Sequence, residues 1–267
     1  MAMIKDDFLH HDAVDYWPRK YSLLGVGVSS TTYTEVVSVL IGAARRRLPA
    51  LVDFAPVSVL VEAERDPVFR SKLNSFNLVC PDGQPVRWVL NYFYKAGLTD
   101  RVCGTTTMLR LCEAAARENI GVYLYGGTDV TLEALQANLR HMFAQLRISG
   151  AEAPPFRPLT PEEVHNAVAR INASGAGFLF VGIGSPKQES FVWEQRLSIE
   201  PIQLCVGAAF DFIAGSKRRA PGWMQKAGLE WLHRVIKEPL RLGKRYLWGN
   251  SRFLLLLSME LLRPRRR

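Results

Sequence analysis

The chain has 267 residues, of which 48% are hydrophobic and 22% charged, which is ordinary for a folded protein able to bury a large core. Its net charge of +9 is uneven: residues 217–267 hold fourteen Lys or Arg and three acids, a net of +11, whereas residues 1–216 hold 20 basic and 22 acidic residues, a net of −2. The composition and hydropathy predict reduced cysteines, no signal peptide and no segment long enough to span a bilayer of about 30 Å.

Strand and helix patterns alternate along most of the chain. We expect a lead of residues 1–20 without order, a catalytic domain at 21–216, and an appendage at 217–267. Strands are expected at 21–28, 51–54, 78–80, 121–125, 146–148, 178–183 and 202–208, and helices at 31–46, 57–65, 84–94, 105–118, 129–143, 161–172 and 186–197. Apolar strands between amphipathic helices predict an α/β fold with a Rossmann-like, mostly parallel sheet and helices on both faces.

Two helix starts carry recognisable capping signals. Threonines near residue 105 are available to cap the helix at 105–118. Thr160, with Pro161 after it and Glu163 three residues on, predicts a capping box at the next helix start.

Polar motifs follow several of the predicted strands. They are Pro81-Asp82-Gly83, Gly126-Gly127-Thr128, the segment 184–189, and Asp211. Ligands of open parallel sheets bind outside the carboxyl ends of the strands. The shared position of these motifs therefore predicts an active site at that edge of the sheet.

Each motif also has a purely structural interpretation. The segment 182–189 is neither a dinucleotide fingerprint nor a Walker A loop, so it could bind an anion or form an ordinary turn. Asp82 could be a general base or a cap for the next helix. Gly126 and Gly127 could cradle phosphate or make a tight turn, and Asp211 could bind ribose hydroxyls or be satisfied by backbone amides.

The basic tail predicts an amphipathic helical appendage that lies on an anionic membrane and binds phosphate. A solvated basic face is the common explanation for such a run, but the interleaved aromatic residues count against it. No histidine cluster and no Asp-x-Asp motif is present, so arginines are expected to serve the phosphate chemistry in place of a metal ion. Four cations could gather on one side of the tail: Arg234, Arg241, Lys244 and Arg245.

From about residue 51 to residue 246, the chain resembles the WecG/TagA/CpsF family of bacterial glycosyltransferases, glycosyltransferase family 26. Each matching segment is modest alone, but their order and spacing together are specific. The resemblance implies a fold of the GT-E type, completed by the C-terminal appendage. The matching segments are 81–83, 101–104, 123–127, 181–189, 206–212, 219–221 and 229–241.

The resemblance implies an inverting, metal-independent hexosyltransferase that needs no cofactor. It would move a hexose-type sugar from a UDP-sugar to a sugar-diphosphoundecaprenol acceptor, in surface or extracellular polysaccharide synthesis, as a peripheral protein on the cytoplasmic membrane face. The family usually has Thr-x-Asn where this chain has Phe54-Ala55-Pro56. The donor sugar is therefore open between N-acetylmannosamine, glucose and another hexose.

Site roles follow from the resemblance by position. Asp82 would be the catalytic base, Gln188 and Asp211 would bind the donor, and Arg101 would line the same pocket. The predicted donor site is completed by the strand-exit residues Gly126, Gly127, Gly184, Lys187 and Glu189. The acceptor diphosphate would meet Arg234, Arg241, Lys244 and Arg245.

Two other classes of function compete with the glycosyltransferase interpretation. A non-catalytic nucleic-acid binder could use the basic, aromatic tail, but it would not need the motifs at the strand ends. An NAD-dependent enzyme would need a GxGxxG fingerprint with an acid near the end of the next strand. No nucleic-acid partner is therefore expected, although self-association away from the membrane stays open. Melting shifts with UDP, NAD and short DNA would discriminate the three classes.

Overall fold

The computed structural model describes residues 17–262, without the side chains of residues 241–242, 244–247 and 260–262. Residues 1–16 of the expected lead lie outside this part, whereas Trp17 packs against the core and Lys20 begins the first strand. β1 (Lys20–Leu23) and β2 (Val26–Ser29) form an antiparallel hairpin, where one strand was expected at 21–28. The chain reverses there because Leu24 and Gly25 both adopt positive φ angles, of 53° and 81°.

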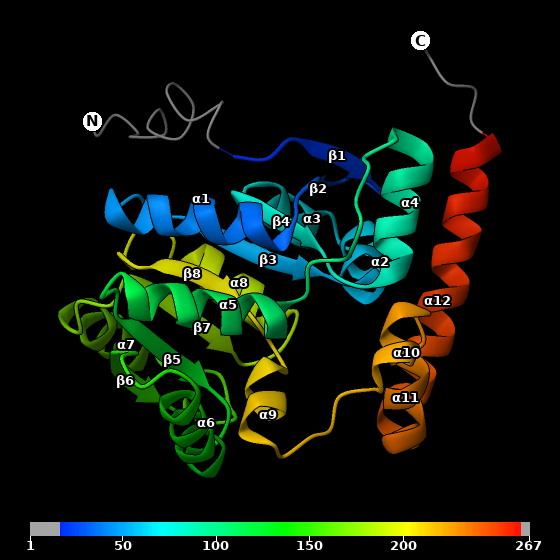
Figure 1. The fold of residues 1–267 in the computed structure, drawn as a ribbon. Coiled ribbons are helices and arrows are strands. Elements are labelled where there is room, and N and C mark those ends of the chain that lie inside the picture. Colours follow the sequence, from blue (N-terminus) through cyan, green and yellow to red (C-terminus); the bar gives the residue numbers. More distant parts are fainter. Residues whose placement is uncertain (1–16, 263–267) are drawn as a thin grey trace.

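A six-stranded parallel sheet forms the centre of the molecule, with the strand order β4-β3-β8-β7-β5-β6 (Figure 1). All neighbouring strands in it run parallel. The predicted Rossmann-like class is therefore confirmed, and the carboxyl ends of all six strands share one edge. The strands are β3 (Leu51–Ala55), β4 (Leu78–Pro81), β5 (Val122–Gly126), β6 (Ile148–Glu152), β7 (Phe178–Gly182) and β8 (Ile202–Cys205).

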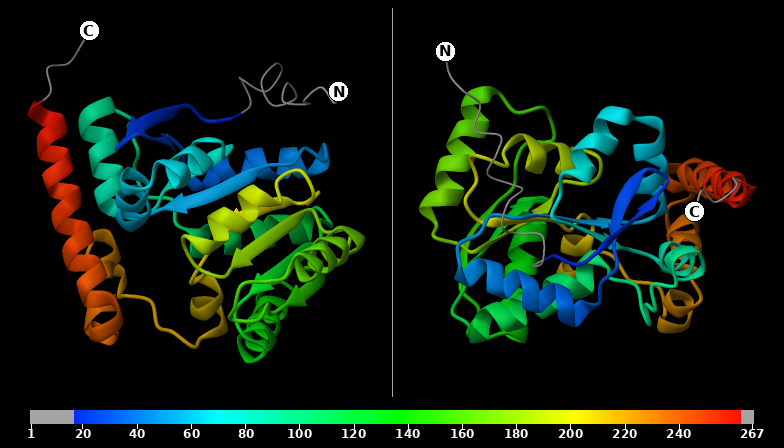
Figure 2. Two further views of the ribbon diagram at one scale, coloured as in Figure 1. Left: turned by 180° about the vertical axis from the view of Figure 1, so that it is seen from behind. Right: turned by 90° about the horizontal axis from the view of Figure 1, so that it is seen from above.

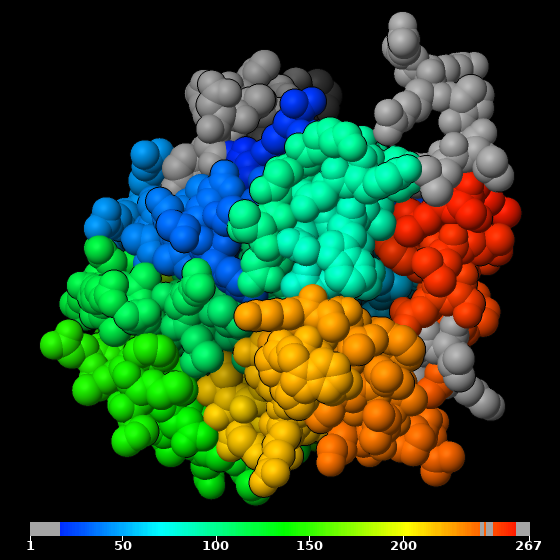
Figure 3. Space-filling view, turned by 45° about the vertical axis from the view of Figure 1, so that its right-hand side comes forward, coloured from blue at the N-terminus to red at the C-terminus, as the bar shows by residue number. Residues whose placement is uncertain are grey.

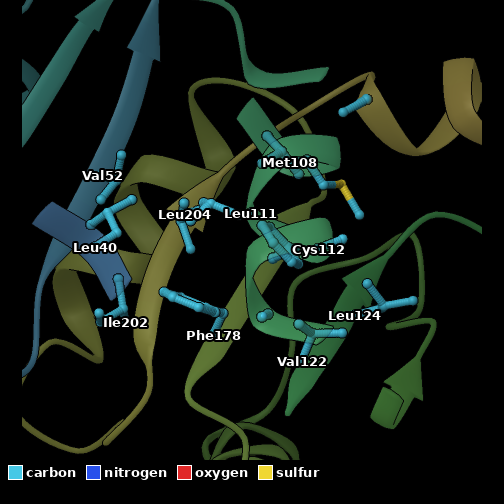
Figure 4. Packing of buried hydrophobic residues seen from close by; sticks show 14 of the residues in the cluster. Leu40, Val52, Met108, Leu111, Cys112, Val122, Leu124, Phe178, Ile202 and Leu204 are labelled. Atoms are coloured by element: carbon cyan, nitrogen blue, oxygen red, sulfur yellow. The ribbon is translucent and has the colours of Figure 1, made fainter. Parts of the chain in front are cut away.

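Helices cover both faces of the sheet, and each face has its own apolar core. Buried side chains of α1 (Tyr33–Arg45), α5 (Gly104–Arg117), α6 (Asp129–Met142) and α9 (Ala209–Ala214) fill the first core. Figure 4 shows this packing, with Leu40 and Leu111 close to Val52, Phe178 and Leu204 of the strands. The second core is filled by α2 (Val57–Arg65), α3 (Pro67–Asn74), α4 (Gln84–Tyr94), α7 (Pro161–Ala173) and α8 (Lys187–Glu194).

Besides the hairpin, α3 was not predicted, and the strand expected at 202–208 ends at Cys205. Of three further local predictions, two were wrong and one was confirmed. The last parallel strand spans 148–152 instead of 146–148, because Gly150 pairs with Tyr123 and leaves room for its ring. The sequence around Gly150 lacks the run of apolar residues from which a buried strand is predicted. Cys103, and not a threonine, occupies the N-cap of α5, and its side chain makes no capping hydrogen bond to the helix backbone. Thr160 and Glu163 do form the predicted capping box of α7.

The C-terminal appendage is helical and packs on the sheet domain. It consists of α10 (Gly222–Lys226), α11 (Glu230–Lys237) and α12 (Pro239–Leu262). Phe253 of α12 is only 3% exposed and belongs to the second core, and Arg252 forms an ion pair with Glu64 of α2 at 2.8 Å. Two opposite views place α12 along the outside of the molecule, beyond the edge where β3 and β5 point (Figures 1 and 2). In Figure 3 the appendage and α4 make up one continuous face.

Candidate active site

Asp82 lies directly after β4, at the carboxyl edge of the sheet. Its backbone N–H continues the strand pairing by donating to the carbonyl of Ala55, at 3.3 Å. The next residue, Gly83, has a φ of +95° and takes the N-cap position of α4. Asp82 is therefore not the cap of that helix, and its side chain, 26% exposed, projects from the sheet edge.

Arg101 is held next to Asp82 by the backbone. The N–H of Val102 donates to the carbonyl of Pro81 at 2.9 Å, so residues 101–102 run alongside the end of β4. Arg101 Nη1 lies 3.9 Å from Asp82 Oδ1 and forms an ion pair with Glu230 at the start of α11. Only 6% of Arg101 is exposed, so its charge acts in a poorly solvated place.

Two further arginines approach Asp82 from the C-terminal part of the chain. Arg219 donates to Gln225 Oε1 at 3.1 Å, and Arg101 donates to the same oxygen at 3.3 Å. Arg234 of α11 lies over the ring of Phe212, 5.2 Å from its centroid. Both Arg219 and Arg234 act electrostatically on Asp82. The sheet edge and the appendage therefore bring three guanidinium groups to one carboxylate.

The pKa of Asp82 is raised to about 6 by this environment. Burial is the largest cause, and the negative charge of Glu230 acts in the same direction. Arg101, Arg234 and Arg219 oppose the rise because they favour the ionised carboxylate. A carboxylate with this pKa is ionised at neutral pH yet basic enough to accept a proton from a positioned hydroxyl.

The glycines at the strand ends play different parts. At Gly126, whose φ is +135°, a Cβ would lie 2.5 Å from the backbone of Gly182, so strand packing alone requires glycine there. Gly127, with a φ of +71°, leads into Thr128, whose hydroxyl caps α6 as in the structural interpretation. Gly184 has a φ of +87°, and among the described residues no atom beyond its chain neighbours lies within 4 Å of where a Cβ would be. Its backbone is therefore the open one of the three.

The predicted donor residues on α8 and α9 differ in exposure. Lys187 is exposed at the first turn of α8, whereas Gln188 and Glu189 are buried, with Gln188 Nε2 donating to Glu189 Oε1 at 3.2 Å. Asp211 lies in α9, where Lys217 Nζ contacts its Oδ2 at 2.9 Å. Asp211 is therefore partnered by a cation of the appendage region, an arrangement that neither sequence interpretation contained.

The comparison with known protein families identifies the chain. The model of the glycosyl transferase WecG/TagA/CpsF family matches residues 21–267. The chain belongs to this family. The resemblance seen in the motifs is confirmed, and the match extends beyond residues 51–246 to include the hairpin and the whole of α12. The protein is therefore a glycosyltransferase.

Several residues near Asp82 were given no role from the sequence, although Arg219 and Glu230 lie in segments that match the family. Arg219, Gln225 and Glu230 belong to the surroundings of Asp82. Glu230 could have been singled out from the sequence, because it is one of only three acids among the cations of the tail. Phe54, of the segment 54–56 that departs from the expected Thr-x-Asn, is buried in the first core and packs near Gly104. The side chains of Arg241, Lys244 and Arg245 lie outside the described part of the structure.

Residues 17–262 were also searched for metal-ligand clusters, membrane-spanning helices and exposed apolar surface. Among the side chains that the structure describes, no three His, Cys, Asp or Glu come together as a metal site. None of the described helices combines the length and apolar character needed to cross a bilayer. Exposed apolar side chains do gather on α11 and α12, where Leu240 is 98% exposed and Ile236, Leu254, Leu255 and Met259 are more than half exposed.

Proposed function

We propose that this glycosyltransferase moves a hexose-type sugar from a UDP-sugar to a sugar-diphosphoundecaprenol acceptor, with inversion and without a metal ion, for a surface or extracellular polysaccharide. One observation carries the proposal: Asp82 lies 3.9 Å from Arg101 and in the electrostatic field of Arg219 and Arg234. The reaction needs a base for a weak nucleophile and positive charge for a diphosphate leaving group. These residues supply both kinds of group in one place.

Asp82 would act as the general base. A sugar hydroxyl is a poor nucleophile, and a positioned carboxylate that accepts its proton contributes roughly 10²–10⁴ in rate. Attack of that oxygen on the anomeric carbon, from the side opposite UDP, breaks the bond to the diphosphate and inverts the configuration. The pKa of about 6 suits this step, because Asp82 is ionised at neutral pH and gains the proton readily.

The arginines would neutralise the diphosphates. Guanidinium groups bind phosphate oxygens with two parallel hydrogen bonds and keep their charge throughout. Arg101 belongs to the sheet domain, and Arg219, although part of the basic tail, donates to Thr106 of α5, which suits the donor. Arg234 lies further along the tail on α11, which suits the acceptor. Arg241, Lys244 and Arg245 follow in α12 and extend the proposed acceptor site by their place in the sequence.

The appendage would dock on the anionic cytoplasmic face of the membrane. The net charge of +11 over residues 217–267 and the exposed apolar side chains of α11 and α12 support this placement. Basic residues near an anionic surface add about 1 kcal/mol each, and inserted apolar side chains add to that binding. A prenyl-linked acceptor held in that membrane would then present its diphosphate beside Arg234.

Transfer assays with Asp82→Asn test the proposal. Wild-type protein, a panel of UDP-hexoses and a synthetic prenyl-diphosphate sugar should give a lipid-linked product, with one donor preferred. Asp82→Asn should keep its fold, by circular dichroism, and lose about 10²–10⁴ in turnover because the amide cannot accept the proton. Asp129→Asn, an exposed carboxylate in the first turn of α6, is the matched control and should leave turnover unchanged. Turnover by Asp82→Asn within a few-fold of wild type would contradict the proposed base.

A further inference from the structure

Two acidic side chains lie in the interior, beneath the proposed donor site. Asp53 is in the middle of β3, and Glu189 is on α8, which packs against that strand. Both residues are fully buried, and their carboxyl groups lie close enough to interact electrostatically. Within the described residues, no side-chain donor bonds to either carboxylate oxygen of Asp53. Glu189 accepts a hydrogen bond at Oε1, from Gln188, but its Oε2 has no partner among those residues.

Two ionised carboxylates cannot face each other in a dry interior without a large cost. A proton held between them removes the repulsion and turns two acceptors into a donor and an acceptor. Burial, followed by the charge of Glu189, raises the pKa of Asp53 well above its usual range, and burial also raises the pKa of Glu189. Asp82, Ser185, Gln188, Cys80 and Cys205 also interact with the pair, and none of these five groups is a cation.

The pair fixes the orientation of the Gln188 amide. Gln188 Nε2 donates to Glu189 Oε1 at 3.2 Å, so the carbonyl oxygen of the amide points the other way. That oxygen is buried and has no partner in the described structure. It lies beside Gly207, 3.6 Å from where a Cβ would be. A free carbonyl oxygen can only accept, so a group that binds to it must be an O–H or N–H and cannot be a phosphate oxygen.

We propose that Asp53 and Glu189 share one proton and thereby hold Gln188 so that its carbonyl oxygen accepts a hydrogen bond from a hydroxyl or N–H of the donor's sugar or base. The inference rests on the proposed function, because it takes the donor to be a nucleotide sugar. Asp53 and Glu189 are positioning residues that act through Gln188. This explains why the conspicuous acid of the 184–189 motif has no exposed surface.

The shared proton is tested by stability, without any substrate. In the unfolded chain both carboxyls ionise near pH 4, whereas the folded pair keeps one proton to a higher pH. The folded state then binds one proton more, so wild-type stability should fall as pH rises above about 5. Asp53→Asn keeps a hydrogen bond to an ionised Glu189 and needs no proton. Urea unfolding between pH 5.5 and 8 should give a slope that differs from wild type by about one proton.

The positioning of Gln188 is tested by donor binding. Glu189→Leu removes the acceptor for Gln188 Nε2 and should weaken binding of UDP-glucose or UDP-N-acetylmannosamine by about tenfold in calorimetry, with KM rising more than kcat falls. Glu189→Gln keeps an acceptor oxygen and should recover most of that affinity. Glu194→Gln, an exposed carboxylate on the same helix that pairs with Lys72, is the control and should match wild type in both experiments.

The outcomes separate this inference from the proposed function. An unchanged pH slope in Asp53→Asn, or a folded Glu189→Leu variant with wild-type donor affinity, would overturn the shared-proton arrangement. If wild type binds neither UDP-sugar and transfers none from the panel, the proposed function fails, while the pH slope still reports on the pair. A one-proton change in slope together with weaker donor binding by Glu189→Leu would support the inference.

Discussion

Asp82 shows how one carboxylate can be both ionised and basic. Desolvation raises its pKa and three arginines lower it, and the result, about 6, depends on the balance between them. Glu230 takes part in that balance twice, since it repels the charge of Asp82 and also pairs with Arg101. The proton affinity of the proposed base is therefore set partly by the appendage.

We expect kcat/KM for sugar transfer to decrease as the pH is lowered through about 6, with the slope of a single protonation. Asp82 must be ionised to accept a proton, and kcat/KM reports the pKa of groups in the free enzyme. Glu230→Gln removes a negative charge that raises this pKa, so its acid limb should move to lower pH. Profiles of kcat/KM from pH 4.5 to 8 measure the wild-type limb and its shift in Glu230→Gln. Glu194 is at the C-terminal end of α8, opposite the end that follows β7, and pairs with Lys72, so Glu194→Gln should leave the limb in place. A limb that stays put in Glu230→Gln would contradict the assignment to Asp82.

At the scale of elements, the sequence located most helices and strands of the sheet domain, although it missed the short helix α3. The pattern of 84–94 predicted α4 with its observed ends, and the capping box at Thr160 located α7. Prediction failed where a long-range contact decides the structure, as at Gly150, which lies under Tyr123, or where the left-handed Leu24 and Gly25 reverse the chain. The surroundings of Asp82 could be predicted only in part, because Arg219 and Glu230 reach it through the path of the appendage.

Phe253 should be the main anchor of α12 on the sheet domain. Its side chain is almost fully buried in the second core, and α12 packs along α2. Phe253→Ala removes a large buried ring and should lower the free energy of unfolding by about 3 kcal/mol. Urea unfolding measures this loss, and Leu254→Ala, the exposed neighbour on the same helix, should cost less than about 0.5 kcal/mol. Equal effects of the two substitutions would show that α12 is not packed as described.

At the scale of the whole molecule, the sheet domain and the appendage depend on each other. Arg101 belongs to the domain but pairs with Glu230 of α11, and Asp211 of α9 contacts Lys217 at the start of the basic tail. Removing residues 217–267 would therefore uncover the site and the socket of Phe253 together. A truncation would therefore change folding, catalysis and membrane binding at the same time. Substitutions of exposed residues on α12 can test membrane binding without disturbing the other two.

Leu254→Asp with Leu255→Asp should abolish binding to anionic vesicles while leaving the fold intact. Both leucines are more than half exposed, so the change costs little packing, but it removes apolar surface and adds two negative charges against an anionic bilayer. Co-sedimentation with phosphatidylglycerol vesicles measures the loss, and raised salt should weaken wild-type binding. Leu197→Asp, at an exposed leucine between α8 and β8 in the sheet domain, should sediment like wild type. Because a prenyl-linked acceptor lies in the membrane, the double variant should also lose transfer to vesicle-bound acceptor while keeping its affinity for UDP. If the double variant still binds vesicles, these α12 side chains do not form the membrane-docking surface.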